Sequence, residues 1–429
     1  TINALHQQNS FDFGISLGDT CNSTQYNELR WYIDVLDGKA ITPSSGAHLG
    51  AGTIDYQKPY QAAGLDKSIP WYQALGNHDH FWMGSIPVDY GYRKDLRQSY
   101  ISDEVFATAD ILKNPALINN HDYYMGVLDG STAYGDIKYA GLVADFKTPP
   151  KVIADLNRRS LLRTEWMKEF FNTSTNPPGH GFNLADANNG FACYSFVPNP
   201  AVPIKVIVLD DTQKEDDGSL DIHGHGFLDQ ARWNWLKKEL AAGDAAGQLM
   251  IIAAHIPIGV EVTAPNSELG WWTDPQNAVT LPDLITELQS HPNLIMWIAG
   301  HRHLNTVKAF ISPDPLNAPE KGFWQVETSS LRDFPQQFRT FQVYLNSDNT
   351  ISIVTTDVDL AVKDGSPAAI SRKYAIATGQ IIGFADEMKN HNPTKDSTVK
   401  PMPTSSYNAE LVKKLSPLMQ AKLQKLGKE

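Results

Sequence analysis

Short apolar runs recur along the chain, and each is followed at once by polar residues or by a glycine that precedes them. Runs of this length, rich in bulky apolar residues and bounded by polar segments, are typical of strands buried on both faces of a sheet. They span residues 11–17, 70–75, 249–254 and 294–299. In open α/β sheets, ligands bind just outside the carboxyl ends of such strands. If the runs are parallel neighbours, the residues that follow them should meet at one edge of one sheet.

The residues that follow these runs are of types that bind metal ions. They are Gly18-Asp19, Gly76-Asn77-His78-Asp79, His255 and Gly300-His301-Arg302-His303. Glycine lets the backbone approach closely. A carboxylate, an amide oxygen and three imidazoles suit borderline divalent ions such as Mn, Fe, Zn or Co, and they fit a calcium site poorly. Taken singly, Asp19 could be a turn residue and His255 a core histidine, but the recurrence favours one shared metal site.

Apolar residues at helical spacing predict helices between these strands. One begins near a cap at Ser23 and ends at Gly38, and a second follows a cap at Ser160. A third spans residues 227–240, and a fourth opens with a capping box at Thr280. Further strands are predicted at residues 193–197, 204–209, 322–329, 340–345 and 350–355. A strand, a site loop and a helix form half of a βαβ unit, so the pattern predicts the α/β class.

Two long segments interrupt this pattern, and a polar end follows it. Residues 39–68, rich in Gly, Pro, Ser and Ala, predict a surface loop, and residues 81–190 predict an insertion with many aromatic side chains. Residues 409–427 predict a lysine-rich, peripheral helix that is interrupted at Pro417. We therefore expect a main domain over residues 1–364 and a C-terminal extension over residues 365–429.

The composition is that of a soluble globular protein. The 429 residues are 41% apolar and 20% charged, and no apolar run is long enough to predict a membrane-spanning helix. The formal net charge of −12 argues against a surface that binds nucleic acid. Cys21 and Cys193 give no disulfide framework. An acidic protein that binds phosphate needs local positive charge, which bound metal would supply.

A site with these ligands is suited to hydrolysis of a phosphate ester. Asp19 has two carboxylate oxygens and can bridge two ions about 3.5–4 Å apart, which lower the pKa of a bridging water and clamp a phosphoryl group. His78 is placed to meet the leaving oxygen. The adjacent Asp79 is expected to hold the His78 imidazole in orientation and to favour its protonated state.

Other polar residues near the strand ends have ordinary interpretations. We interpret Asp210 and Asp211 as structural and His223 and His225 as part of a solvated loop, while alternation points Arg302 away from its neighbours. The candidates for lining a substrate pocket are His80, His180, Asn22, Trp271 and Trp272. For the two tryptophans, ordinary loop packing is an equal alternative.

These motifs and their order resemble the signature of the calcineurin-like metallophosphoesterases. The resemblance spans about residues 9–360 and includes the stretches 194–196, 206–210 and 327–335. It implies a sandwich of two mixed β-sheets flanked by helices, with residues 1–364 as the catalytic domain. More narrowly, the chain is similar to a bacterial group with long inserts, whose precursors commonly carry a twin-arginine export signal. That similarity implies an exported or periplasmic protein.

Carried over to this chain, the resemblance implies two divalent transition-metal ions. The ligands implied for one ion are Asp19, Asn77, His255 and His301. Asp19 would bridge to the second ion, which His303 would bind. His78 would act as an acid or stabilise the transition state.

Two features depart from the family pattern. The family's Asp-x-His motif is absent from residues 1–18, where His6 alone is a weak substitute. The second ion therefore lacks two ligands, and we expect the natural chain to begin upstream of Thr1. Asn22 stands where purple acid phosphatases have a tyrosine ligand, so no purple iron(III) chromophore is expected.

Together these observations predict metal-dependent hydrolysis of a small phosphorylated substrate, with monoester and diester both open. The alternative is a non-catalytic protein that keeps the fold as an interaction platform. The presence of Asn77, His78, His255, His301 and His303 argues against that alternative, since a platform has no need of them.

Overall fold

The computed structural model describes residues 1–43, 59–89, 97–98, 100–101, 123–124, 141–142, 154–216, 224–258, 276–381 and 408–426. Trp271, Trp272 and His223, which were considered as site residues from the sequence, lie outside these ranges. Within them, no helix has both the length and the apolar character needed to cross a membrane.

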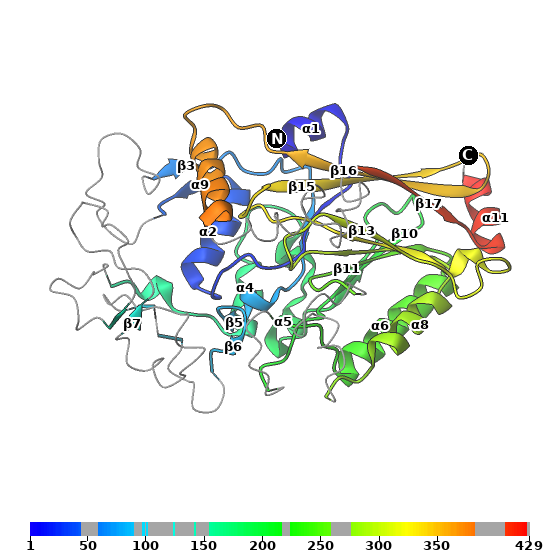
Figure 1. The fold of residues 1–429 in the computed structure, drawn as a ribbon, viewed down its shortest axis with the longest axis horizontal. Helices are drawn as coiled ribbons and strands as arrows, with labels where there is room; N and C mark the ends of the chain where they lie inside the picture. Colours follow the sequence, from blue (N-terminus) through cyan, green and yellow to red (C-terminus); the bar gives the residue numbers. More distant parts are fainter. Residues whose placement is uncertain are drawn as a thin grey trace, which may run out of the picture.

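The centre of the molecule is a six-stranded mixed sheet in the order β13-β14-β12-β11-β10-β9 (Figure 1). The four inner strands are parallel, and the edge strands β9 and β13 are antiparallel to their neighbours. The bounds are β9 (Tyr194–Phe196), β10 (Ile204–Leu209), β11 (Leu249–Ala254), β12 (Leu294–Ala299), β13 (Thr306–Phe310) and β14 (Phe323–Glu327). Every residue of β11 and β12 is buried, as expected for apolar runs covered on both faces.

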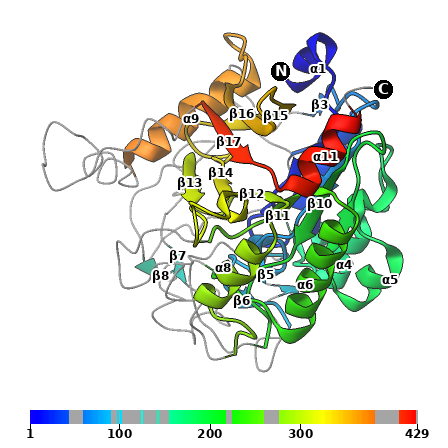
Figure 2. The ribbon, with the colours of Figure 1, turned by 90° about the vertical axis from the view of Figure 1, so that its right-hand side faces the viewer.

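Two helices, α6 (Gln230–Ala245) and α8 (Leu281–Ser290), cover one face of this sheet (Figures 1 and 2). Trp297 of β12 is fully buried there in one apolar cluster with Leu236 and Leu284 of the helices. The N-cap of the predicted capping box is confirmed at Thr280, whose Oγ1 accepts a hydrogen bond from the backbone N–H of Asp283 at 3.3 Å, while the return bond of the box stays a prediction.

The opposite face is covered by a second layer of strands. β1 (Gly14–Ser16) and β4 (Trp71–Gln73) form a parallel pair, and three longer strands form an antiparallel sheet in the order β15-β16-β17. The three are β15 (Gln337–Leu345), β16 (Thr350–Asp359) and β17 (Ala409–Lys414). Trp71 of β4 and Ile351 of β16 share one buried cluster with Ile251 of the central sheet. The α/β class, with stacked sheets and flanking helices, is therefore confirmed.

Helices also cover the side of the second layer that carries β1 and β4. Leu29 of α2 (Tyr26–Asp37) and Trp166 of α4 (Arg163–Glu169) are fully buried in the same cluster as Trp71. As predicted, α2 ends at Gly38, whose φ of 74° is left-handed. Ser23 and Ser160 are not the caps, because α2 begins after Gln25 and α4 after Leu162.

The remaining elements are shorter or lie at the periphery. They are α1 (Ile2–Gln8), β2 (Ala40–Ile41), β3 (Tyr60–Gln61), η1 (Asn77–Asp79), β5 (Phe81–Trp82), β6 (Ile86–Pro87), β7 (Tyr123–Tyr124), β8 (Gly141–Leu142), η5 (Leu156–Arg158), η6 (Pro178–Gly181), α5 (Leu184–Asn189), η7 (Pro319–Lys321), α9 (Pro367–Ile381) and α11 (Pro417–Leu426).

The expectation that all four ligand-bearing strands share one sheet was wrong. Among the strands that the structure describes, β1 and β4 pair only with each other, whereas β11 and β12 lie in the central sheet. The ring of Tyr72 on β4 stacks at 3.5 Å on Phe196 of β9, the edge strand of the central sheet. The two strand systems therefore meet across an aromatic contact and not through a shared hydrogen-bond ladder.

The C-terminal prediction was also wrong in part. The stretch Ala409–Lys414 is a strand that pairs with β16, and only α11 is helical. Residues 411 and 413 are buried and residues 412 and 414 exposed, which is the period of a strand. This segment therefore completes a sheet, although the predicted domain boundary near residue 364 stays a prediction.

Candidate metal centre

Four predicted ligands converge at the carboxyl ends of β1, β4, β11 and β12. His255 Nε2 lies 3.2 Å from Asp19 Oδ2 and 3.0 Å from Asn77 Oδ1. It also lies 3.2 Å from His301 Nδ1. One possible ligand atom from each of Asp19, His255 and His301 lies within 4.8 Å of the other two. Among the described residues, this is the group of side chains found that could hold a metal ion. We call Asp19, Asn77, His255 and His301 the ligand cluster.

The hydrogen bonds around the ligand cluster turn acceptor atoms toward its centre. His255 Nδ1 lies 2.6 Å from the backbone oxygen of Leu17, which can only accept, so Nδ1 carries the proton and Nε2 of the neutral ring is an acceptor. Asn77 Nδ2 donates to the oxygen of Gly84 at 2.8 Å, which leaves Asn77 Oδ1 as an acceptor toward His255. Acceptors that face one another repel unless a cation lies between them. A carboxylate, an amide oxygen and two imidazoles therefore fit a borderline divalent ion.

The pKa values of the ligand cluster reflect how closely its titratable groups lie to one another. Burial alone would lower the pKa of His255, but the Asp19 carboxylate outweighs it and raises that pKa to about 9. Burial would raise the pKa of Asp19, yet the charges of His255 and His78 hold it well below its usual value. Burial and the neighbouring His255 keep the pKa of His301 well below its usual value. Without a metal, a proton on His255 takes the place of the cation, so metal binding must displace it.

The loops that carry the ligands adopt backbone conformations that ordinary side chains avoid. Asp19 has a φ of 57° and His301 a φ of 71°, which are left-handed values. The two glycine turns also touch, since a Cβ on Gly76 would lie 2.2 Å from Asp19 Oδ1 and one on Gly18 would lie 2.5 Å from Gly76 N. Both glycines are therefore required for the Asp19 loop to meet η1.

Asp79 forms its hydrogen bonds with the Asp19 loop and Gly76, and not with the His78 ring, contrary to expectation. Its Oδ2 accepts hydrogen bonds from the backbone N–H groups of Asp19 and Gly76. Its Oδ1 accepts from the N–H groups of Thr20 and Cys21 and from the Thr20 hydroxyl. Burial and the charge of Asp19 raise the pKa of Asp79 to about 7, while these five donors favour its charged form. Asp79 therefore holds the Asp19 loop against η1.

His78 lies beside the ligand cluster with one ring nitrogen held. Its Nδ1 lies 2.6 Å from the backbone oxygen of Asn22, and its backbone N–H donates to Asp19 Oδ1 at 3.0 Å. Because a carbonyl oxygen only accepts, Nδ1 carries a proton and Nε2 is left for other partners. The half-buried His78 is thus oriented by Asn22, a residue predicted to line the pocket.

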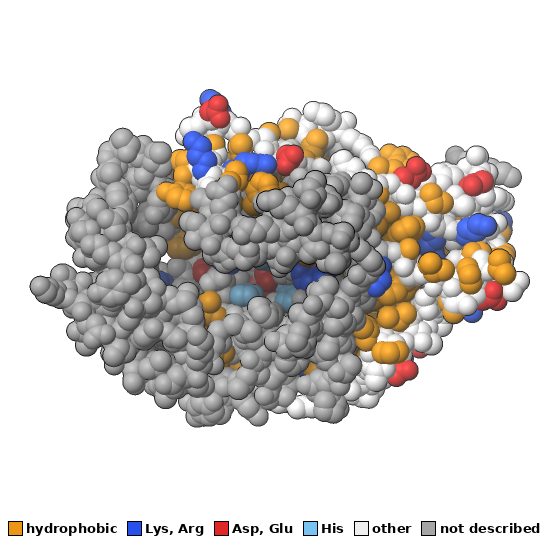
Figure 3. Space-filling model, viewed as in Figure 1, with side chains coloured by type: hydrophobic (Ala, Val, Ile, Leu, Met, Phe, Trp, Pro, Cys, Tyr) orange, Lys and Arg blue, Asp and Glu red, His pale blue; other side chains and the backbone are white. Residues whose placement is uncertain are grey.

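His303 lies outside the group of converging ligand atoms. Its Nδ1 pairs with Asp333 Oδ2 at 2.5 Å, and both side chains are about one third exposed at 30% and 28%. A carboxylate that holds one imidazole nitrogen orients the other, as is common for metal-binding histidines. A second ion bound by His303 stays a prediction. Figure 3 shows histidine side chains at the surface beside acidic and basic ones on this face of the molecule.

Two residues predicted to line the pocket are core histidines. His80 is 1% exposed, and its two nitrogens lie 2.9 Å from Glu215 Oε1 and Thr212 Oγ1. Burial and the charge of Arg163 lower the pKa of His80 to about 4. His180 is fully buried and stacks on Trp71 with ring centroids 3.4 Å apart. The sequence suggested that both residues lie near the loops of the proposed site, but it could not show that their rings turn into the core.

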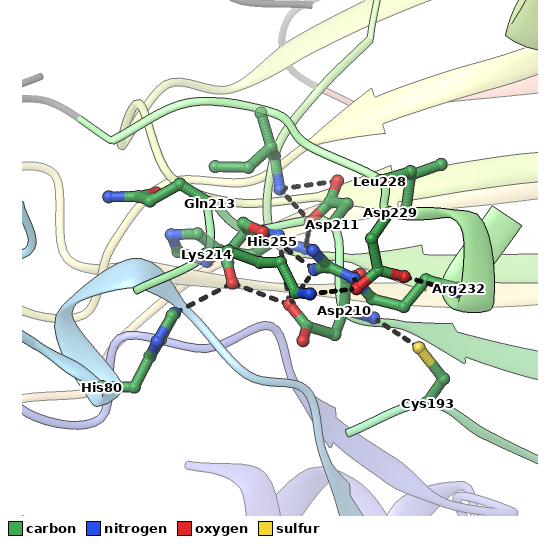
Figure 4. A network of polar contacts seen from close by, with 12 residues as sticks. His80, Cys193, Asp210, Asp211, Gln213, Lys214, Leu228, Asp229, Arg232 and His255 are labelled. Carbon is green, nitrogen blue, oxygen red and sulfur yellow. Dashed lines mark hydrogen bonds and ion pairs between the residues drawn. The ribbon is translucent and has the colours of Figure 1, made fainter. Parts of the chain in front are cut away.

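Asp210 and Asp211 are structural, as predicted (Figure 4). Asp211 Oδ1 accepts the backbone N–H groups of His255 and Ile256 at 3.1 and 3.0 Å, which fixes the start of the His255 loop. Asp210 forms buried ion pairs with Arg232 at 3.0 Å and Arg163 at 2.5 Å. Sequence reasoning missed Arg163, because nothing in the predicted insertion marks an arginine that reaches this network.

Arg302 points away from the ligand cluster, as alternation predicted. Its guanidinium forms two hydrogen bonds with the buried carboxylate of Glu327, at 2.8 and 2.5 Å. Glu327 is the last residue of β14. The ion pair between Arg302 and Glu327 therefore holds the His301 loop against this neighbouring strand.

Comparison with known proteins gives a likeness to solved structures but no sequence match. The sequence matches no family model, and no curated protein sequence is similar to it. Among solved structures, the chain resembles a dimetal phosphatase from Danio rerio, with 16% sequence identity and a TM-score of 0.27. The match covers 39% of this chain and 58% of that chain. What the site does must therefore be argued from its own geometry.

Proposed function

We propose that this protein hydrolyses phosphate esters with divalent transition-metal ions held by the ligand cluster. The observation that carries the proposal is the meeting of Asp19, Asn77, His255 and His301 with acceptor atoms turned inward. A divalent ion in such a site polarises a phosphoryl oxygen and makes a bound water more acidic. The motif resemblance supports the narrower assignment to exported calcineurin-like phosphoesterases, with Asp19 and His303 sharing a second ion.

The chain's own residues would orient the substrate and move a proton. With Nδ1 held by the oxygen of Asn22, a protonated His78 can donate from Nε2 to the leaving oxygen of the ester. Asp79 keeps the Asp19 carboxylate in place by accepting hydrogen bonds from its loop. Neither role needs His80 or His180, which are buried in the core.

Hydrolysis of a generic aryl phosphate tests this proposal. The full-length protein, with the segment expected upstream of Thr1, should turn over p-nitrophenyl phosphate or its bis-ester when supplied with Mn²⁺, and a chelator should abolish the activity. His78→Ala should lower kcat by about 10²–10⁴-fold, as for loss of a general acid, with the bound metal unchanged. His291→Ala, which removes a histidine paired with Asp244, is the matched control and should retain activity.

Two results would contradict the assignment. Metal-loaded full-length protein that turns over neither ester would favour the non-catalytic platform. Loss of bound metal in His78→Ala would show that His78 is a ligand and not an acid.

A further inference from the structure

Arg332 differs from the other arginines in its exposure. Of the arginines that the structure describes, it alone is largely exposed, and 69% of its side chain is accessible. By contrast, Arg163 and Arg232 are committed to Asp210, and Arg302 is committed to Glu327. A guanidinium in this state is available to a ligand.

Arg332 lies between two loops of the proposed site. Its Nη1 donates to Asn22 Oδ1 at 3.0 Å, and the backbone oxygen of the same Asn22 holds Nδ1 of His78. Its Nε lies 3.8 Å from Asp333 Oδ1, and the other oxygen of Asp333 pairs with His303. One exposed cation therefore touches the partners of both His78 and His303.

These contacts use little of what the guanidinium offers. Arginine has five N–H donors in a planar fork, and the hydrogen bond to Asn22 takes one of them. The separation of 3.8 Å from Asp333 exceeds a hydrogen bond, and an exposed ion pair of this kind stabilises a fold little. The position is thus poorly explained by stability alone.

We propose that Arg332 binds an anionic oxygen of the substrate phosphate and favours monoesters over diesters. This rests on the proposed function. Arginine matches phosphate geometry through two parallel hydrogen bonds. A monoester at neutral pH carries close to two negative charges and a diester one, so the attraction to Arg332 is larger for the monoester. This cation also offsets the charge of the neighbouring Asp333 carboxylate in a chain with a net charge of −12.

Phosphate binding tests this role without turnover. Inorganic phosphate is titrated calorimetrically into the Mn²⁺-supplied protein and into Arg332→Gln, with Mn²⁺ binding measured separately. We expect Arg332→Gln to raise the Kd for phosphate about ten-fold or more, as for loss of a charged hydrogen bond, and to leave Mn²⁺ binding unchanged. Arg332→Lys should give an intermediate Kd. Arg372→Gln, which removes a charge paired with Asp359, should match the native protein.

Steady-state kinetics then test the proposed preference for monoesters over diesters. KM for p-nitrophenyl phosphate should rise about ten-fold in Arg332→Gln, while KM for the bis-ester rises about three-fold or less and kcat changes little. An unchanged Kd for phosphate, or equal effects on both esters, would overturn the assignment. So would native protein that binds no phosphate with or without Mn²⁺. If no ester is hydrolysed, the proposed function fails, and the phosphate Kd still decides the role of Arg332.

Discussion

At the scale of single residues, three of the predicted ligands are held by contacts that fix a donor or acceptor atom. His255 is oriented through Leu17 and Asn77 through Gly84, and His303 pairs with Asp333. Such outer contacts orient metal ligands and raise their affinity. The predicted ligands were chosen from the sequence, whereas their partners could not be, because a backbone oxygen or a distant carboxylate carries no local signal.

The role of Asp79 in the structure differs more from the predicted role than that of any other site residue. A testable prediction follows from its observed role. Asp79→Asn should weaken Mn²⁺ binding, although Asp79 is not in the ligand cluster. The introduced amide would point a donor at N–H groups of the Asp19 loop that now donate to Asp79. Calorimetric titration with Mn²⁺ measures the effect, and we expect a loss of about ten- to a hundred-fold in affinity.

The control for this change is Asp12→Asn, which removes the same charge from an exposed residue just before β1. It should bind Mn²⁺ as the native protein does. Native affinity in Asp79→Asn would show that the Asp19 loop holds its shape without these hydrogen bonds.

At the scale of elements, apolar periodicity located most strands and helices but did not say which strands pair. The runs that became β11 and β12 are buried on both faces and are plain in the sequence. The segment that became β17 resembled a helix because its lysines suggested a solvated surface. Its pairing with β16 is non-local, and the burial of Lys413 follows from that pairing.

Lys413 makes the stability of the fold depend on pH. Its side chain is buried at 4% exposure and donates to the backbone oxygens of Glu320 and Gly322. Burial lowers the pKa of Lys413 to about 7, although nearby Glu320 and Asp244 oppose the change. Between pH 7 and 10 the unfolded chain therefore holds a proton that the folded protein has released. The free energy of unfolding should rise with pH over this range, by up to about 1.4 kcal/mol per pH unit.

Urea unfolding at pH 7 and pH 9 tests this dependence. Relative to the native protein, Lys413→Met should lose the rise between the two pH values. Lys414→Met, which changes the exposed neighbour on the same strand, should keep it. Equal pH dependence in all three proteins would mean that Lys413 does not titrate in this range.

At the scale of the whole molecule, the ligand cluster joins two layers of strands. Asp19 and Asn77 follow β1 and β4 in one layer, and His255 and His301 follow β11 and β12 in the central sheet. A bound ion would therefore link the layers in addition to contacts such as the stacking of Tyr72 on Phe196 and the hydrogen bond between His255 and Leu17.

Metal should accordingly raise the melting temperature. An ion that binds only the folded state at 100 times its Kd adds about 2.7 kcal/mol to the free energy of unfolding. Thermal unfolding followed with and without Mn²⁺ should show a rise of a few degrees, and the rise should disappear in His255→Ala. A melting temperature unaffected by Mn²⁺ at millimolar concentration would argue against metal binding by the ligand cluster.

The sequence by itself determined the apolar runs, the residues that follow them and the order of the motifs, because these depend on neighbours in the chain. Only the tertiary structure decided that the runs lie in two strand layers, that Asp79 holds a loop, and that His80 and His180 are buried. The position of Arg332 between Asn22 and Asp333 was likewise decided only by the tertiary structure. The physical reason is that burial and hydrogen-bond partners arise from contacts between residues far apart in the chain, and local periodicity does not encode such contacts.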